Sequence, residues 1–134
     1  MSLARLITLE THKDKRGSFT ELFKQESVKQ VSFSVSLPGI TRSWHKHKNQ
    51  TDYMCVIKGR VKICVSDEKK LEEYILWGEK LQILQILPNI WHGTKNIGKV
   101  SSYILYGVTN FYNCQNPDEE RKKEIKIKGK SYVW

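Results

Sequence analysis

Residues 39–52 read Gly-Ile-Thr-Arg-Ser-Trp-His-Lys-His-Lys-Asn-Gln-Thr-Asp, and residues 88–96 read Pro-Asn-Ile-Trp-His-Gly-Thr-Lys-Asn. Residues two apart on a strand project from the same face, so His45 and His47 are expected to point together. Asp52 follows after a short loop, and His92 follows a proline-bounded turn. The two stretches therefore predict one polar cavity that gathers three imidazoles and a carboxylate.

The rest of the chain is typical of a β-protein. Helical periodicity is scarce, and the one candidate for a helix is the short stretch 24–30. Elsewhere, short runs rich in Val, Ile, Tyr, Phe and Thr alternate with turn residues, which favours strands. We expect strands at residues 4–10, 20–23, 31–36, 41–45, 52–58, 60–66, 80–87 and 101–111, with a weaker one at 124–127. Many short strands with little helix indicate a sandwich or a barrel.

The strands predicted at 52–58 and 60–66 are separated by a single residue, Gly59. The chain is expected to reverse tightly there, because glycine accepts a positive φ. In the second strand, Val61, Ile63 and Val65 occupy alternate positions, which predicts one mainly apolar face.

Composition bounds the class of protein. The chain has 134 residues, of which 39% are hydrophobic and 28% charged, so one domain spanning 1–134 is expected. The net charge of +9 comes from residues in mixed stretches and not from one basic stripe, which argues against a nucleic-acid partner. No run approaches the roughly 18 apolar residues of a membrane span, so no membrane partner and a cytoplasmic location are expected.

The three cysteines lack metal-binding or redox spacing. An odd count without a Cys-x-x-Cys pair argues against a disulfide framework or a zinc knuckle. Cys55 and Cys64 lie in apolar runs, where a free cysteine behaves as a small hydrophobic residue.

The first histidine segment resembles that of the cupin family, which reads Gly, five residues, His-x-His, three or four residues, Glu, six residues, Gly. The matching positions, with Asp in place of Glu, are Gly39, His45, His47, Asp52 and Gly59. The second cupin segment reads Pro-x-Gly-x-x-His, three residues, Asn, and is matched by Pro88, His92 and Asn96 with one residue fewer. Asn89 stands where glycine is usual, and asparagine tolerates the left-handed conformation, so the turn is expected to survive. The resemblance implies an all-β double-stranded β-helix, the cupin jelly-roll barrel, in a single domain.

Two nucleotide-sugar branches of the cupins share more of the chain. Residues 16–23, 42–45 and 105–112 are similar to the Arg-Gly-x-Phe-x-Glu-x-Phe, Arg-Gly-Leu-His and Tyr-x-x-Thr-x-x-Tyr segments of the dTDP-4-dehydrorhamnose 3,5-epimerase family. Residues 42–48 and 88–92 are similar to the Arg-Gly-x-His-Ala-His-Lys and Pro-x-x-Trp-His segments of the dTDP-4-keto-6-deoxyglucose 3,4-ketoisomerases. The resemblance implies an isomerase that abstracts a proton beside the carbonyl of a dTDP-4-keto-6-deoxyhexose, in polysaccharide or deoxysugar biosynthesis.

The resemblance also implies roles for individual residues. The catalytic set comprises His45 as base, Tyr112 as a candidate acid, and His47. Arg42 is expected to grip the diphosphate, since arginine binds such oxygens bidentately. Trp44 or Trp91 is a candidate to stack on the sugar or the base. These cupins usually form homodimers, often by exchanging N-terminal strands, which the strand at 4–10 suits.

An alternative reading stays open. The nucleotide-sugar interpretation requires no cofactor, but the polar set also suits a divalent metal. The ligands of that metal centre would be His45, His47, Asp52 and His92. On this reading the protein is a small metalloenzyme or a sugar-binding module.

Overall fold

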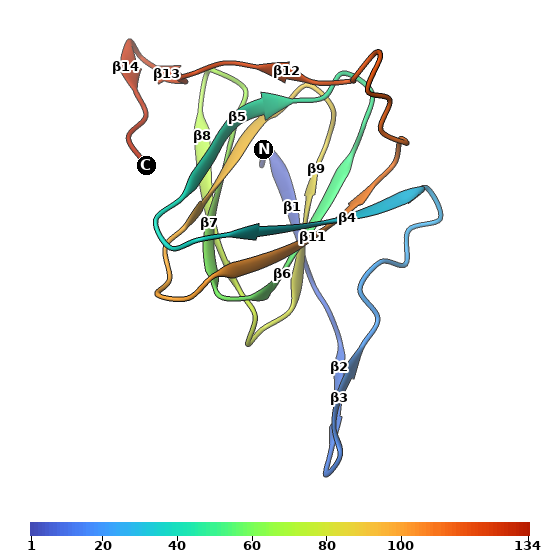
Figure 1. Cartoon of the computed structure of the whole chain (residues 1–134). Helices are drawn as coiled ribbons and strands as arrows, with labels where there is room; N and C mark the ends of the chain where they lie inside the picture. The colour runs from blue at the N-terminus through green and yellow to red at the C-terminus, as the bar shows by residue number, and fades with distance from the viewer.

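The computed structural model describes residues 1–134 and contains strands and no helix. The strands are β1 (Ala4–Thr8), β2 (Thr11–Asp14), β3 (Gly17–Thr20), β4 (Gln30–Ser36), β5 (Thr41–Lys46), β6 (Asp52–Lys58), β7 (Arg60–Ser66), β8 (Leu71–Trp77), β9 (Gln82–Ile86), β10 (Trp91–Asn96), β11 (Ser102–Val108), β12 (Glu120–Arg121), β13 (Lys126–Ile127) and β14 (Lys130–Ser131). Ten of them form two five-stranded sheets, in the orders β1-β9-β6-β11-β4 and β12-β5-β10-β7-β8. The sheets enclose a barrel, as Figure 1 shows. The all-β jelly-roll prediction is confirmed.

The apolar core lies between the sheets. Strands β6 and β7 run through its centre, and both turn alternate residues inward. The predicted apolar face of residues 60–66 is confirmed, because Val61, Ile63 and Val65 are all at most 1% exposed. Each such side chain contributes on the order of 1.5–3 kcal/mol by leaving water. The fully buried cluster comprises Met54, Val56, Val61, Ile63, Val65, Leu76, Leu84, Ile86 and Ile104.

Gly59 carries the chain from one sheet to the other. The expected tight reversal is corrected, because β6 pairs with β9 and β11 whereas β7 pairs with β8 and β10. The glycine requirement is nevertheless real: φ is +85°, and a Cβ would lie 3.1 Å from the Cα of Ser102. Only glycine combines this conformation with so close a neighbour.

The predicted helix at residues 24–30 is wrong. This segment is irregular and reaches β4, which begins at Gln30. Phe23 and Val28 pack on the outer face of the first sheet, in a cluster around the buried Cys55. Phe23 lies on Gly107, where a Cβ would approach its ring to 2.8 Å. A stretch this short does not nucleate a helix by itself, so packing on the sheet decides its conformation.

The prediction missed five strands, β2, β8, β10, β12 and β14, and placed β3 too late in the chain. Strand β2 pairs with β3 in a hairpin that projects from the barrel in Figure 1. Strand β8 was hidden by two consecutive glutamates, Glu72 and Glu73, which break its apolar alternation. Strand β10 has an inward face of buried polar residues, His92, Thr94 and Asn96.

Cys55 and Cys64 are free and buried, as predicted, and Cys114 is free and exposed. Burial raises the pKa of each buried thiol to about 11, so both are inert packing groups at neutral pH. A helix with the length and apolarity needed to cross a membrane does not occur in the structure.

Candidate active site

Two adjacent strands of the second sheet bring His45 and His92 together. Residue His45 of β5 pairs with His92 of β10, and both side chains face the space between the sheets. Their ring centroids are 4.3 Å apart. The turn before β10 contains Asn89 with φ of 67°, as the asparagine substitution predicts, and the Asn89 N–H donates to the His47 carbonyl at 2.7 Å. This hydrogen bond fixes the turn against the end of β5.

His47 and Asp52 complete the cluster from either side of the crossover between the sheets. The His47 ring lies 5.9 Å from that of His45 and 5.5 Å from that of His92. Asp52, the first residue of β6, places Oδ2 3.4 Å from Nε2 of His47 and 3.4 Å from Nε2 of His92. The prediction that the three imidazoles face one another is confirmed, but only His45 and His47 line the cavity, whereas His92 is buried.

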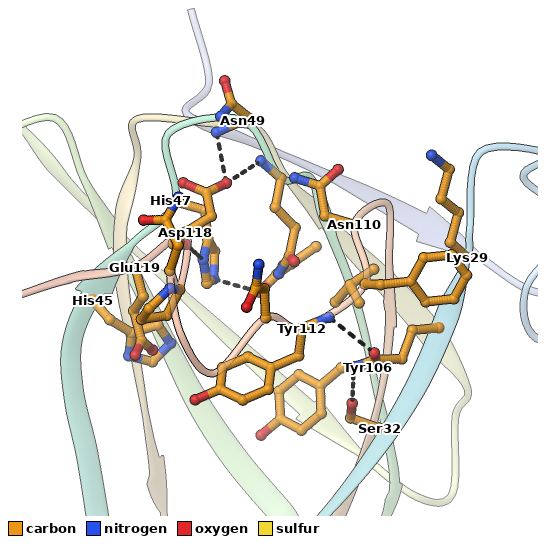
Figure 2. Close-up of a pocket in the computed structure, with 18 residues that line it drawn as sticks. Lys29, Ser32, His45, His47, Asn49, Tyr106, Asn110, Tyr112, Asp118 and Glu119 are labelled. Atoms are coloured by element: carbon orange, nitrogen blue, oxygen red, sulfur yellow. Dashed lines mark hydrogen bonds and ion pairs between the residues drawn. The ribbon is translucent and has the colours of Figure 1, made fainter.

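The cavity beside this cluster has a volume of about 660 Å³. Figure 2 shows His45 and His47 on one side and the aromatic and amide side chains of residues 106–113 on the other. Segment 109–119, which links β11 to β12, closes over one side of the cavity. The lining is predominantly polar, which suits a sugar better than an apolar ligand.

The surroundings shift the pKa values of His45 and His47 in opposite directions. Burial, assisted by the neighbouring His92 and His47, lowers the pKa of His45 to about 3. Burial also acts to lower the pKa of His47, but the hydrogen bond and charge of Asp52 outweigh it and raise that pKa to about 9. Burial alone would raise the pKa of Asp52, whereas the imidazoles of His47 and His92 hold it well below its usual range. At neutral pH the site therefore contains a neutral His45 beside an ion pair of His47 and Asp52.

Hydrogen bonds fix the tautomers. Nδ1 of His92 donates to the Ile90 carbonyl at 3.0 Å, since a carbonyl can only accept. Its buried Nε2 has no aligned hydrogen-bond partner, although Asp52 lies within 3.4 Å. This atom is therefore an orphaned polar group aimed into the cluster, available to a ligand.

Asp118 holds segment 109–119 against the histidine cluster, a role that the sequence did not reveal. Its carboxylate accepts the backbone N–H groups of Lys48 and Asn49 at 2.8 Å and of Gln50 at 3.0 Å. Its own carbonyl accepts from Nδ1 of His47 at 2.6 Å. The partners lie about 70 residues upstream, and no local pattern marks them.

Two tyrosines line the cavity. Tyr112, the predicted acid, sits on segment 109–119 and is 69% exposed. Tyr106 on β11 is a second candidate that the prediction missed; its hydroxyl is 2.8 Å from Oγ of Ser34. Burial raises the pKa of Tyr106, so it stays protonated at neutral pH. Its inward direction is readable from the sequence, because Ile104 and Val108 share its side of the strand.

Arg42 shares a face with His45 because the β5–β10 ladder contains a bulge. The register shifts between His92 and Thr94, so Arg42 pairs with the inward-facing Thr94. The guanidinium donates to Oγ of Ser36 at 2.8 Å and to the Val35 carbonyl at 3.1 Å. Arg42 does not line the main cavity. It lines an adjoining cavity of about 320 Å³ together with Arg121, and His45 and Glu119 border both.

Trp44 and Trp91, the residues predicted to stack on a ligand, do not line the main cavity, although Trp44 borders the adjoining one. Both indoles belong to a buried cluster on the outer face of the second sheet. Trp44 is adjacent to His45 on one strand and Trp91 is adjacent to His92 on another, so alternation directs both outward.

Comparisons with known proteins agree with the fold. The chain is 29% identical over 127 residues to the probable low-salt glycan biosynthesis epimerase Agl13 of Haloferax volcanii, covering 84% of this chain and 81% of the relative. It is 30% identical over 109 residues to a UDP-2-acetamido-2,6-beta-L-arabino-hexul-4-ose reductase of Pseudomonas aeruginosa, but the match spans only 29% of that protein. A dTDP sugar isomerase from Desulfovibrio desulfuricans superposes with a TM-score of 0.80 at 19% identity, over 90% of this chain and 83% of that one.

The fold and these relatives are consistent with one family. The family model described as "Polysaccharide biosynthesis C-terminal domain" matches residues 12–120. The chain therefore belongs to the polysaccharide biosynthesis C-terminal domain family.

Proposed function

We propose that this protein is an epimerase or ketoisomerase that acts on the 4-keto-6-deoxyhexose of a nucleotide sugar, dTDP in the first instance, in polysaccharide or deoxysugar biosynthesis. The observation that carries the proposal is the neutral His45 at the wall of a polar cavity, next to the charged pair of His47 and Asp52. The named functions of the relatives, a glycan epimerase and a dTDP-sugar isomerase, support the same chemistry.

The site suits removal of a proton beside a ketone. The C–H bonds next to the carbonyl are acidic because the enolate spreads its charge onto oxygen, and a neutral imidazole can accept the proton. The low pKa makes His45 a weak base, so the enolate needs stabilisation. The imidazolium of His47 supplies positive charge within the same cluster. Returning the proton to the opposite face would epimerise the carbon. Delivering it to the former carbonyl carbon, while the adjacent hydroxyl gives up its proton and the former ketone oxygen takes one, would move the ketone.

Tyr106 and Tyr112 are the candidates for returning the proton. Tyr106 is fixed on a strand by its contact with Ser34, whereas Tyr112 is mostly exposed. A proton donor acts within hydrogen-bond reach of the reacting carbon, so the ordered hydroxyl is the better placed of the two.

The adjoining cavity is the candidate diphosphate subsite. Arg42 and Arg121 both line it, and it meets the main cavity at His45. Guanidinium groups bind phosphate oxygens bidentately, so the two arginines suit a dianionic group placed next to the base. The net charge of +9 would favour approach of an anionic substrate.

The test is solvent-deuterium incorporation into a 4-keto sugar nucleotide, offered as dTDP and UDP derivatives, with thermal shift as the binding readout. Wild-type protein should exchange a proton next to the carbonyl, and His45→Gln should lower the rate by about 10²–10⁴-fold. Glu79→Gln, an exposed amide substitution in the β8–β9 loop, is the matched control and should exchange normally. Absence of both binding and exchange with every sugar nucleotide offered would overturn the proposal.

A divalent metal centre is the second candidate, favoured by one observation. Ring nitrogens of His45, His47 and His92 lie within 4.8 Å of one another, and the orphaned Nε2 of His92 is among the available donors. Three imidazoles with the Asp52 carboxylate fit Zn²⁺, Fe²⁺, Mn²⁺ or Ni²⁺. A metal ion held there would supply Lewis-acid polarisation of the ketone. Elemental analysis decides: stoichiometric metal that His47→Ala removes supports this candidate, whereas activity in metal-free protein contradicts it.

A homodimer and a cytoplasmic location complete the proposal. Strand β4 exposes Val31, Phe33 and Val35, and Tyr103 of β11 contacts Phe33 edge-to-face with ring centroids 5.5 Å apart. A second copy would cover this strip. In the single chain β1 pairs with its own β9, so strand exchange remains a prediction. Sedimentation should give a dimer that Phe33→Asp dissociates and Val133→Asp leaves intact. Three free cysteines suit a reducing compartment.

A further inference from the structure

Residues 122–134, here called the strap, cover the outer face of the second sheet. Strand β12 adds to the edge of β5, and Trp44 and Lys122 then exchange two backbone hydrogen bonds of 3.1 Å. The strap continues along the upper edge of the barrel in Figure 1 and turns back through the hairpin of β13 and β14. Ile125 of the strap is fully buried, and the Tyr132 N–H donates to the Ile125 carbonyl at 2.8 Å. The strap is therefore packed and hydrogen-bonded.

Trp134 of the strap lies directly behind the histidine cluster. Its ring centroid is 4.9 Å from that of Trp44, the neighbour of His45 on β5. Its Cζ2 also lies close to Gly93, the neighbour of His92 on β10, where a Cβ would be 2.9 Å away. Because neighbouring residues on a strand face opposite ways, one indole touches the back of both strands that present the imidazoles.

Trp134 contacts β5 and β10 at the point where the backbone ladder between these two strands is interrupted. The register between β5 and β10 shifts opposite Gly93, between the pairs of His92 and Thr94. A bulge interrupts the hydrogen-bonded ladder, and the space that a Cβ of Gly93 would need is occupied by Ser43 of β5, whose Cβ would be 2.6 Å away, together with Trp134. An aromatic ring packed over such a glycine restores cross-strand contact.

The strap fixes the indole from its other sides. Tyr132 packs edge-to-face on Trp134 with ring centroids 5.4 Å apart. The ammonium group of Lys62 lies 5.6 Å from the Trp134 ring and 3.5 Å from a carboxylate oxygen of Glu73. A cation over a ring face favours one orientation of that ring. These contacts hold the Trp134 ring in one orientation, and the ring in turn restricts the position of Trp44.

We propose that Trp134 is a positioning residue, which holds His45 and His92 in their reactive orientation by clamping the β5–β10 bulge through Trp44 and Gly93. The expected change in kcat rests on the proposed function, whereas the expected change in the orientation of the two imidazoles does not. Misplacing a catalytic group by about 1 Å can cost 10²-fold in rate. Loss of the clamp should therefore lower kcat and leave KM nearly unchanged, because the substrate-facing residues remain in place.

The experiment compares Trp134→Ala and Trp134→Phe with Ile127→Ala. Ile127 is the matched control, since it packs against the same outer cluster from the same strap. Imidazole resonances of ligand-free protein, assigned by nuclear magnetic resonance, report the orientation of His45 and His92 without any substrate. Melting temperature reports stability, and proton exchange into a 4-keto sugar nucleotide reports kcat and KM separately.

Trp134→Ala should shift both imidazole signals and lower kcat by about 10- to 100-fold, with KM within about threefold. Trp134→Phe, which keeps a ring, should recover part of both effects, and it alone decides the question should the alanine variant not fold. Ile127→Ala should lower the melting temperature without changing signals or kcat. Unchanged imidazole signals in both Trp134 variants, or equal losses of kcat in the control, would overturn the inference. An inactive wild-type protein would refute the proposed function, while the resonances would still test the clamp.

Discussion

His47 and Asp118 are joined twice: the imidazole donates to the Asp118 carbonyl at 2.6 Å, and the Asp118 carboxylate caps the backbone that follows His47. The charged member of the histidine cluster is thus tied to the segment that closes the cavity. A ligand that moves this segment also moves the hydrogen bond to His47. Movement of segment 109–119 therefore changes both access to the cavity and the hydrogen bond of the charged His47.

Asp118→Ala should loosen the closing segment. It removes three charge-assisted hydrogen bonds to the backbone of residues 48–50, so we expect KM to rise about tenfold and stability to fall by about 1–2 kcal/mol. Steady-state kinetics and urea unfolding measure the two effects. Asp67→Ala is the control, because Asp67 caps two backbone N–H groups outside the cavity. A KM increase of the same size in the control would show that the effect is not specific to the closing segment.

Tyrosine substitutions should separate the two candidate acids. Tyr106→Phe removes the hydroxyl fixed near Ser34, and we expect kcat to fall by about 10²–10³-fold. Tyr112→Phe should lower kcat less than about tenfold, because its exposed hydroxyl is poorly held. The two variants serve as controls for each other in single-turnover measurements. The opposite ranking would assign the proton return to Tyr112.

Stability should decline as pH rises from about 6.5 to 9. The pKa of His47 is raised from 6.5 to about 9 by Asp52, so the folded state retains a proton that the unfolded state loses. The stabilisation is complete below pH 6.5 and disappears as pH passes 9. Urea unfolding at several pH values measures it. Asp52→Asn should remove this decline, and a slope that survives the substitution would assign it to other groups.

The acid side should show the opposite dependence, caused by His45. Its pKa is lowered from 6.5 to about 3, so the unfolded state binds a proton that the folded state refuses. Stability from this residue is complete above pH 6.5 and is lost as pH falls towards 3. His45→Gln should flatten the unfolding profile between pH 6 and 4. Glu79→Gln should keep the wild-type slope there.

Two glycines with the same sign of φ should differ in their tolerance of alanine. Gly129 has φ of +79° with nothing within 4 Å of a Cβ, so Gly129→Ala should cost about 1 kcal/mol from backbone strain. Gly59 adds a contact of 3.1 Å with the Ser102 backbone, and Gly59→Ala should cost about 2–4 kcal/mol. Equal losses in urea unfolding would mean that the crossover relaxes around the new methyl group.

The histidine cluster was predictable because its determinants are local. Alternation orients His45 and His47, and the spacing of the second segment supplies His92. The same alternation excludes Trp44 from the cavity, since its neighbour faces inward; the functional assignment of that tryptophan ignored this rule. Asp118 was not predictable, because its hydrogen bonds close a loop of about 70 residues. Its position depends on how the sheets pack, which no local pattern encodes.

The strands that were missed have a common physical reason. β10 has buried polar residues, His92, Thr94 and Asn96, on its inner face, so it lacks the apolar alternation of an ordinary strand. β8 carries adjacent glutamates, and Glu73 meets Lys62 on the neighbouring strand. Polar side chains that form contacts between strands resemble loop residues when only the sequence is considered.

Asp52 belongs to the first sheet, whereas His45 and His92 belong to the second. The approach of Asp52 to His92 at 3.4 Å therefore measures the separation of the two sheets at the open end of the barrel. Any sliding of one sheet over the other changes this distance before it disturbs the apolar layer further along β6. Hydrostatic compression, which acts on such interlayer spacings, should consequently register first in the proton equilibria of the site.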